Sequence, residues 1–489
     1  MSHSFRTFAA CALAALALAG AGCGKSGTLS PNRAPETIVF VSGDLDTVRH
    51  IVTLSWFGTD PDGVVDHYEF KWIYEDGQAP AGYDSSAWFT TARTESTFSV
   101  WTPNRTSMPT FVVRTIDDEN AADPTPARQT FRFFNLPPRV SFTGTPVLPP
   151  TTLPVATVRW AATDPDGDIA RASYQVWLDG NLSTATILPP GTSEFTIPPA
   201  AFSDGAGGYV TGAHEVFIRC IDDGGAVSLH DSFTWNVTAP QGEVLLVDDV
   251  PLGQSLKVDP AYRNALNRQL GSPAAYTILD LELANPFRSA ADITATFGFF
   301  RSVIWYQEMN TARSAALPMA ENAIRTQLAA GGNVYVCSTI LVGTAGAIAN
   351  QGFLADVVGA DSVRLNAKLG TTAFSIGNGA LVHPAAGTPY DSLKAVGIST
   401  DVDALILRQA ADVAFEARPI VLDSSQVEPW TIGVDRVPAG GAGRFVFLTF
   451  PLRYLAGTPP GAPLPAPDAD YAEKTIRRVL ARFGHGANP

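Results

Sequence analysis

The chain has 489 residues, of which 45% are hydrophobic, and its formal net charge at pH 7 is −14. This length predicts about three domains, and the acidic balance argues against binding to the phosphate backbone of nucleic acids. Glycine (42 residues) and proline (37 residues) are abundant but dispersed, which indicates many turns rather than one long disordered tract.

Residues 1–23 have the features of a secretion signal. Arg6 precedes an apolar run, and three small residues then lead to Cys23. This ending resembles the lipobox of bacterial lipoproteins, with Gly20 standing where that family prefers leucine. The resemblance implies that Cys23 is lipidated and becomes the mature N-terminus. Ordinary signal cleavage nearby is the alternative.

The segment after Cys23 predicts how the chain is tethered and to which membrane it is attached. Residues 24–34 are small and polar, which is typical of a flexible tether. Gly24 stands where an aspartate would retain a lipoprotein in the inner membrane of enteric bacteria, so the resemblance implies the outer membrane or the cell surface. We find no second apolar run long enough to cross a bilayer, and we expect the lipid to be the membrane anchor.

A sequence unit of about 100 residues occurs twice, which indicates a repeated domain. The segment 52–63 (VTLSWFGTDPDG) matches 156–167 (ATVRWAATDPDG), so that Trp56 aligns with Trp160. Further on, FVVRTIDD (Phe111–Asp118) matches VFIRCIDD (Val216–Asp223) at nearly the same spacing.

Both copies predict β-sandwiches. Apolar residues alternate with polar ones, and the motif Asp-Pro-Asp-Gly between two such runs has the composition of a turn. We therefore expect one sandwich over residues 35–136 and another over 137–240. The pattern resembles the fibronectin type III or immunoglobulin-like modules of bacterial surface proteins.

Paired aspartates recur in each copy and suggest a calcium site. Carboxylate oxygens are the ligands that Ca²⁺ prefers, and the two pairs of one copy would meet at one end of a sandwich. The alternative is that these side chains cap turns through their own oxygens. The candidate ligands are Asp60, Asp62, Asp117 and Asp118 in the first copy, and Asp164, Asp166, Asp222 and Asp223 in the second.

From residue 241 to residue 489 the pattern changes to alternating strands and helices. The segment Gly242–Asp249 (GEVLLVDD) predicts a fully buried central strand that ends in two carboxylates. We expect a three-layer α/β domain with a mostly parallel sheet. Strands are expected at 243–248, 275–279, 302–306, 333–337, 404–407, 413–417, 431–434 and 444–450, and helices from Asp259 (N-cap, with Pro260 next) to Gly271, over 315–330 and over 470–483.

The segments VLLVDD, VIWY and GGNVYVCST, in this order, resemble the class I glutamine amidotransferase-like fold, and more closely its divergent members on bacterial surface proteins. In the active amidotransferases the matching strand ends in a nucleophilic cysteine flanked by glycines, and a His-x-Glu pair follows. Cys337 occupies that point, but Tyr335 and Thr339 replace the glycines and the His-x-Glu pair is missing. A Cys337–His383 dyad is one hypothesis, and a buried thiol is the other.

A ligand site, if the domain has one, is expected beyond the carboxyl ends of the strands, where the chain switches direction across the sheet. Aromatic, carboxylate and amide groups at this edge suit a sugar or a peptide. The alternative is that the two aspartates cap the next loop and that the aromatic side chains belong to the core. The candidate residues are Asp248, Asp249, Tyr306, Gln307, Glu308 and Ser338, with Thr339 nearby.

Together these features predict a membrane-anchored extracytoplasmic lipoprotein without enzymatic activity. Its sandwiches would act as a spacer, and its α/β domain would bind a surface glycan or protein. The competing hypothesis is a cell-envelope hydrolase or amidase that uses Cys337 with His383. No cofactor is expected other than calcium, and nucleic acid is not expected as a partner.

Overall fold

The computed structural model describes residues 31–40, 48–75, 79–307, 316–339, 341, 348, 350–364, 368–369, 372–373, 381–394, 403–417, 429–452 and 471–486. Contacts divide the chain into two compact units. The first contains residues 1–138 with the segments 164–168 and 221–227, and the second contains residues 139–163, 169–220 and 228–489. The predicted signal segment with Cys23, and residues 24–30 of the predicted tether, lie outside the described residues.

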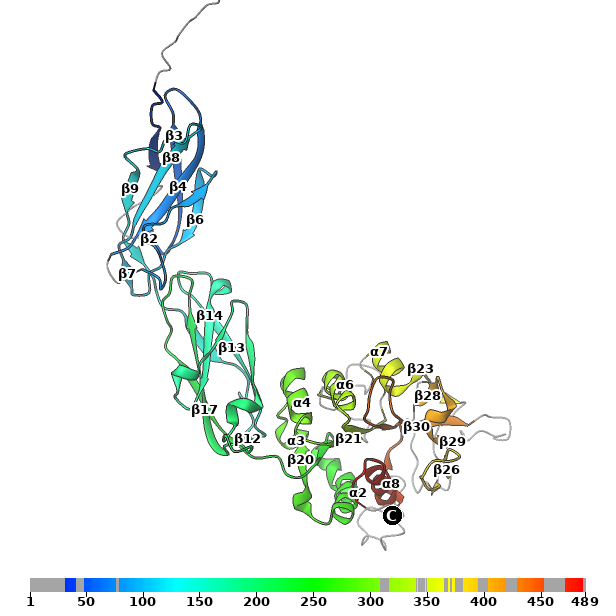
Figure 1. Ribbon diagram of the computed structural model, residues 1–489. Helices are drawn as coiled ribbons and strands as arrows, with labels where there is room; N and C mark the ends of the chain where they lie inside the picture. The colour runs from blue at the N-terminus through cyan, green and yellow to red at the C-terminus, as the bar shows by residue number, and fades with distance from the viewer. Residues whose placement is uncertain are drawn as a thin grey trace, which may run out of the picture. The chain divides into compact units, whose positions relative to one another are not determined.

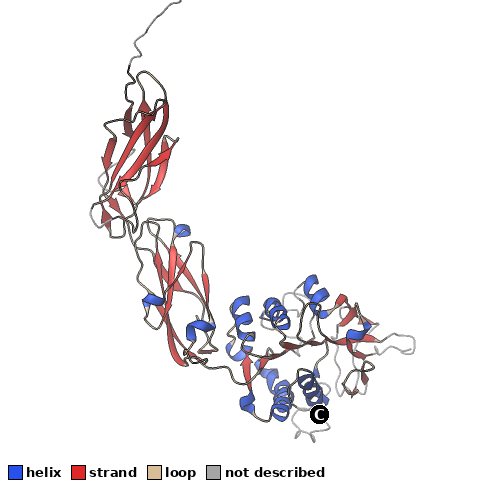
Figure 2. Cartoon of the chain, in the orientation of Figure 1, coloured by secondary structure: helices blue, strands red, loops and turns tan. Residues whose placement is uncertain are grey.

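The first unit contains two antiparallel sheets of three and four strands (Figure 2). Side chains from both sheets, among them Trp56, Tyr68 and Phe111, share one buried cluster, which makes this part of the chain a β-sandwich, as predicted. One sheet has the order β1 (Glu36–Phe40), β3 (Ile51–Thr59), β6 (Glu95–Ser99), and the other has the order β5 (Phe89–Thr91), β4 (Val65–Ile73), β8 (Thr110–Asp117), β9 (Ala127–Thr130). The short strands β2 (Val48–Arg49), β7 (Thr106–Ser107) and β10 (Phe133–Phe134) form a third sheet.

The second sandwich repeats this plan around Trp160, Tyr174 and Trp235, which share another buried cluster. Its sheets have the orders β11 (Arg139–Phe142), β13 (Ala156–Thr163), β16 (Glu194–Ile197) and β12 (Thr151–Thr152), β18 (Asp231–Val237), β17 (Gly212–Ile221), β14 (Ser173–Leu178), β15 (Thr186–Leu188). Three short 3₁₀ helices lie in the connections between its strands, namely η1 (Ile169–Arg171), η2 (Leu182–Thr184) and η3 (Pro199–Phe202).

The C-terminal part of the second unit is built on five parallel strands. Strand β19 (Val244–Asp248) pairs in parallel with a strand on each side, and all five of its residues are buried, as predicted. Its expected central position is wrong, because β19 lies next to the edge strand β20 (Tyr276–Asp280). The parallel order is β20 (Tyr276–Asp280), β19, β21 (Ser302–Gln307), β22 (Asn333–Ser338), β31 (Phe445–Leu448).

Beyond β31 the same sheet continues with antiparallel strands, so the expectation of a mostly parallel sheet is wrong for this half. The connection from β30 to β31 spans only residues 437–444, and so short a link joins neighbouring strands as an antiparallel pair. The sheet is therefore mixed. Its antiparallel strands are β30 (Trp430–Arg436), β29 (Val413–Ala417), β26 (Leu381–Pro384), β27 (Leu393–Lys394), β28 (Ala404–Leu407) and β23 (Ala360–Arg364), and β24 (Lys368–Leu369) pairs separately with β25 (Thr372–Ala373).

Helices lie on both faces of the parallel strands (Figure 1). Val244 and Leu246 of β19 pack in a cluster with α2 (Leu252–Leu270) and α8 (Tyr471–Arg482), whereas Leu245 and Val247 pack with α4 (Ala290–Phe297) and α6 (Glu321–Ala329). None of the described helices combines the length and apolar character needed to cross a membrane. The shorter helical segments are η4 (Pro273–Ala275), α3 (Leu281–Ala284), α5 (Ala316–Met319), α7 (Gln351–Phe353), the π-helix η5 (Leu354–Val358) and η6 (Ala410–Asp412).

Helix α2 begins earlier than predicted, so that Pro260 lies inside it and Asp259 is not its N-cap. Val258 and Tyr262 are both buried in the core on either side of Pro260, and the benefit of this continuous apolar stripe outweighs the interior proline. The predicted end is confirmed, because Gly271 has a φ of +80° and forms the left-handed C-cap.

Candidate functional site

The carboxyl ends of β19, β21 and β22 bring most of the predicted ligand residues to one edge of the sheet. In the parallel register, Asp248 lies opposite Tyr306, and Tyr306 lies opposite Cys337. Gln307 pairs with Ser338 in the same way. The alignment follows from parallel pairing, which places the last residues of neighbouring strands at one level.

The polar side chains at this edge are bonded to one another and are fully buried. The carboxylate of Asp249 accepts hydrogen bonds from the indole N–H of Trp305, at 3.1 Å, and from the side-chain amide of Gln307. The hydroxyl of Ser338 donates in turn to Oε1 of Gln307 at 3.3 Å. At most 1% of the surface of any of these residues is exposed. A carboxylate so enclosed acts as the acceptor of a buried network.

Two further members of the predicted site, Asp248 and Tyr306, also have structural partners. Oδ1 of Asp248 accepts a hydrogen bond from the backbone N–H of Val250 at 3.1 Å, which is the loop-capping role expected as the alternative. Tyr306 stacks on Tyr262 with 4.1 Å between ring centroids, and its hydroxyl donates to Asp259 at 3.4 Å. Burial, followed by the charge of Asp248, raises the pKa of Tyr306 well above its usual range. Glu308 lies outside the described residues.

Cys337 and His383, the candidate catalytic pair, do not lie next to each other. Cys337 is fully buried at the end of β22, and its thiol donates to the backbone carbonyl of Phe450 at 3.3 Å. His383 is exposed on β26 and pairs with Glu416 of β29. Strands β31, β30 and β29 separate β22 from β26 in the sheet, which corresponds to about 19 Å at the usual strand spacing.

In the first sandwich the candidate calcium ligands bond mainly to nearby backbone. Asp117 accepts hydrogen bonds from the N–H groups of Glu119 (3.0 Å) and Ala121 (2.7 Å) through Oδ1, and from the amide of Asn32 (2.8 Å) through Oδ2. Asp118 similarly accepts from the N–H of Val64 at 3.1 Å. The bonds from Glu119 and Ala121 are of the turn-capping kind, whereas those from Asn32 and Val64 join segments that are distant in the sequence. Asp60 accepts from the N–H of Asp62 at 3.3 Å, and Asp62 accepts from that of Arg33 at 3.2 Å.

In the second copy the corresponding aspartates also hold turns, and they belong to the first compact unit. Asp222 accepts from the N–H of Ala226 at 2.8 Å and from the amide of Asn135 at 3.2 Å, both through Oδ1. Asp223 bonds to Nε2 of His50 at 2.9 Å. Asp164 accepts from the N–H groups of Asp166 (3.2 Å) and Gly167 (3.0 Å), and Asp166 accepts from that of Leu136 (2.9 Å).

No three His, Cys, Asp or Glu side chains in the described part of the chain are placed to hold a metal ion together. Sequence reasoning missed two members of these clusters, Asn32 and Asn135. Both stand three residues before a proline, Pro35 and Pro138, at the spacing of the repeat. That recurrence was the available signal, because an asparagine repeated together with its aspartates indicates a shared role.

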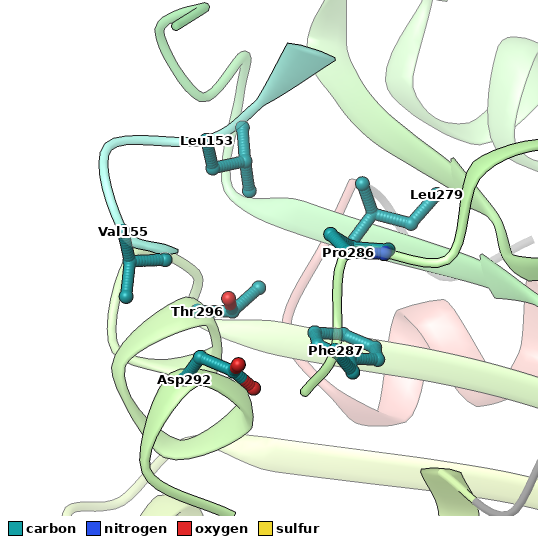
Figure 3. A pocket seen from close by; sticks show the side chains of 7 residues that line it. All are labelled: Leu153, Val155, Leu279, Pro286, Phe287, Asp292 and Thr296. Carbon is teal, nitrogen blue, oxygen red and sulfur yellow. The ribbon is translucent and has the colours of Figure 1, made fainter. Parts of the chain in front are cut away.

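A small pocket lies beside helix α4, and none of the residues of the predicted ligand site lines it (Figure 3). Its charged residue is Asp292, whose carboxylate accepts hydrogen bonds from the backbone N–H groups of Arg288 (2.9 Å) and Ser289 (3.1 Å). Burial raises the pKa of Asp292. The pocket is an apolar seam between the second sandwich and the α/β region. It is lined by Leu153, Val155, Leu279, Pro286, Phe287, Asp292 and Thr296.

No family of known proteins matches the sequence, and no curated protein matches it. Solved structures similar to part of the chain include fibronectin(III)-like modules of Clostridium thermocellum CbhA, with 15% identity over 42% of this chain and 95% of theirs and a TM-score of 0.18. A two-domain fibronectin type III segment of chicken tenascin has 14% identity over 42% and 100%, with a TM-score of 0.17. The PKD1 domain of Vibrio anguillarum Epp has 18% identity over 21% and 96%, with a TM-score of 0.15. The sandwich architecture follows from the strand pairing and from the cores that the paired sheets share.

Proposed function

We propose that this protein is a lipid-anchored lipoprotein of the outer membrane or cell surface, whose two sandwiches act as a spacer for a binding domain. The lipobox-like ending at Cys23 and the repeated sandwich sequence support this proposal. The spacer keeps the C-terminal domain at a distance from the membrane, where it meets a surface glycan or a protein partner.

We assign the C-terminal region to a divergent class I glutamine amidotransferase-like domain with a three-layer α/β plan. Two observations support the assignment. Numbered along the chain, the parallel strands have the order 2-1-3-4-5, which is the flavodoxin-like arrangement with its switch point between strands 1 and 3. Cys337 is the penultimate residue of β22, at the point that the resemblance assigns to the nucleophile.

The burial of Cys337 is the observation that favours binding over catalysis. A nucleophilic thiol must reach its substrate and must be activated by a base within hydrogen-bond distance. The Cys337 thiol is fully buried against the Phe450 carbonyl, and His383 lies on a distant strand. Such a thiol behaves as a small apolar core group. The alternative proposal is a hydrolase or amidase that uses Cys337 with His383.

Alkylation of the thiols in the folded full-length chain tests this proposal. Cys220 is fully buried in the second sandwich and provides an internal control. We expect iodoacetamide to label Cys337 only when urea unfolds the protein, at a rate similar to that of Cys220. Rapid labelling of Cys337 in native protein, with Cys220 protected, would instead support the enzyme.

The anchor and the ligand need separate measurements. Mass spectrometry of the mature N-terminal peptide is expected to show acyl chains on Cys23, and Cys23→Ser is expected to move the protein from the membrane fraction to the supernatant. The Cys23→Ser chain then serves as the probe on a glycan array. Saturable labelling of the array that the soluble form of the same glycan competes away would identify a glycan as the ligand, whereas a blank array leaves a protein partner as the proposal.

A further inference from the structure

One cluster in the first compact unit contains buried oxygen atoms that are not hydrogen-bonded. It consists of Asn135, Asp164, Asp166 and Asp222 around the ring of His50. The exposed fractions are 0% for Asn135 and His50 and 5% for Asp222. Oδ1 of Asn135, Oδ2 of Asp164, Oδ1 of Asp166 and Oδ2 of Asp222 are buried without a hydrogen-bond partner. Buried acceptors of this kind are normally satisfied by a donor, a water molecule or an ion.

These groups lie close together although they come from three distant segments of the chain. The amide of Asn135 bonds to Oδ1 of Asp222 at 3.2 Å and to the carbonyl of Thr102 at 3.2 Å, which leaves its own oxygen unused. A Cβ atom added to Gly167 would stand 2.3 Å from Oδ2 of Asp164 and 3.0 Å from Cε1 of His50. The glycine therefore permits a close approach of carboxylate and ring.

Two carboxylates of this cluster have raised pKa values. Burial raises the pKa of Asp222, which the nearby charge of Asp164 raises further and that of His50 lowers. Burial also raises the pKa of Asp164, and the charge of Asp166 adds to this effect. Both carboxylates are therefore held in surroundings that disfavour their charged forms, and a bound cation would relieve this repulsion.

The chemistry of the unused atoms selects the class of ion. All four are oxygens, three from carboxylates and one from an amide, and Ca²⁺ takes such oxygens in flexible arrangements of six to eight ligands. Mg²⁺ requires a near-ideal octahedron and gives up its water reluctantly, and zinc prefers nitrogen and sulfur.

We propose that Ca²⁺ binds between Asn135, Asp164, Asp166 and Asp222, with the amide oxygen of Asn135 as a ligand beside the three carboxylates. In the described residues no three acidic, histidine or cysteine side chains are already placed to hold a metal ion together, so the proposed site requires the carboxylates to change rotamer when the ion binds. The ion connects the 135, 164–166 and 222 segments, and its effect is to stabilise the first unit.

The first sandwich contains a matched control, because Asp117 is the counterpart of Asp222 in the repeat. Both carboxylate oxygens of Asp117 are already hydrogen-bonded, Oδ1 to backbone N–H groups and Oδ2 to Asn32. The pair Asp222→Asn and Asp117→Asn therefore removes one charge from equivalent positions, of which only the first is a proposed ligand. An asparagine at 222 keeps an oxygen for the N–H of Ala226, so the turn is retained.

The experiment uses the full-length chain stripped with EDTA and titrated with CaCl2 in a calorimeter, with thermal unfolding measured in parallel. We expect one site with a Kd on the order of 10⁻⁴ to 10⁻³ M, as in other extracellular modules. At 10 mM CaCl2 the Tm of the first unit should rise by about 5 °C. Asp222→Asn should weaken binding at least about tenfold, whereas Asp117→Asn should change the Kd by less than about twofold.

Three results would overturn the proposal: a wild-type Tm that is the same in EDTA and in 10 mM CaCl2, an equal loss of calcium affinity in both variants, or an equal stabilisation by MgCl2. If Asp222→Asn does not fold, Asp166→Asn replaces it, because Asp166 is only partly buried and an asparagine there still accepts the N–H of Leu136. The same tenfold loss is then required.

Discussion

The hydroxyl of Ser289, which caps helix α4, lies 2.9 Å from the hydroxyl of Thr157 in the second sandwich. The side chain of Arg159 donates to the backbone carbonyl of Arg288 beside it. Leu153 and Val155 pack in the same buried cluster as Phe287. The start of α4 is thus held by the sandwich, which couples the stability of the two parts.

Removal of the cap should show this coupling. We expect Ser289→Ala to cost about 1 kcal/mol of unfolding free energy, because an N-cap hydroxyl is lost. In a double-mutant cycle with Thr157→Val, urea denaturation should give a coupling energy of about 0.5 kcal/mol or more. Ser272→Ala is the control, since Ser272 caps η4 without contacting Thr157, and its coupling should be near zero. Equal coupling for both serines would contradict the link.

Replacement of Asp249 tests whether the predicted ligand edge is a structural network. Asp249→Ala leaves the indole of Trp305 and the amide of Gln307 without their acceptor in a buried site. We expect a loss of about 2–4 kcal/mol, measured by urea unfolding, together with a red shift of tryptophan emission. Asp280→Ala, at the end of edge strand β20, should cost about 1 kcal/mol because it removes only a helix cap. A neutral Asp249→Ala variant would show that the network adds no stability.

Gly242 is required where the chain enters β19. Its φ is +64°, and a Cβ atom there would stand 1.7 Å from the backbone carbonyl oxygen of Ala275. We expect Gly242→Ala to lower the unfolding free energy by roughly 3 kcal/mol or more, because a backbone clash adds to the strained φ. Gly271→Ala is the comparison: its φ is +80° with no atom within 4 Å, so only about 1 kcal/mol should be lost. Similar Tm values for the two variants would refute the clash.

His485 should make the second unit sensitive to acid. Burial, followed by the charge of Arg301, lowers its pKa below the ordinary 6.5, and its Nε2 lies 2.8 Å from the hydroxyl of Ser302. The unfolded chain therefore binds a proton below pH 6.5 while the folded chain does not, and stability falls as the pH drops through that value.

The prediction is checked by measuring the unfolding free energy of the wild type and of His485→Gln as a function of pH. Relative to the wild type, the variant should gain stability by at most about 1.4 kcal/mol per pH unit between pH 6.5 and pH 5, and the difference should be constant above pH 7. Parallel curves for the two proteins across pH 5–8 would exclude a contribution from this histidine.

The sequence predicted which residues lie together at the carboxyl ends of the parallel strands but left open what these groups do. The apolar run of Val244–Val247 predicted that β19 is buried on both faces, and parallel pairing then brought Asp248 and Tyr306 to one level. Whether these groups faced solvent could not be predicted. The acceptor of the Gln307 amide, for instance, is Asp249, which is 58 residues away in the chain.

Local patterns in the sequence determined the five parallel strands, where the two sandwiches repeat and that β19 is buried on both faces, because alternation and apolar runs record how each residue faces the core. The tertiary structure alone decided that β30 and its neighbours run antiparallel, that Cys337 lies under the Phe450 carbonyl and that Asn135 joins Asp222. These features depend on which distant segments meet. A local pattern of burial carries no information about which segment a strand pairs with or in which direction that segment runs.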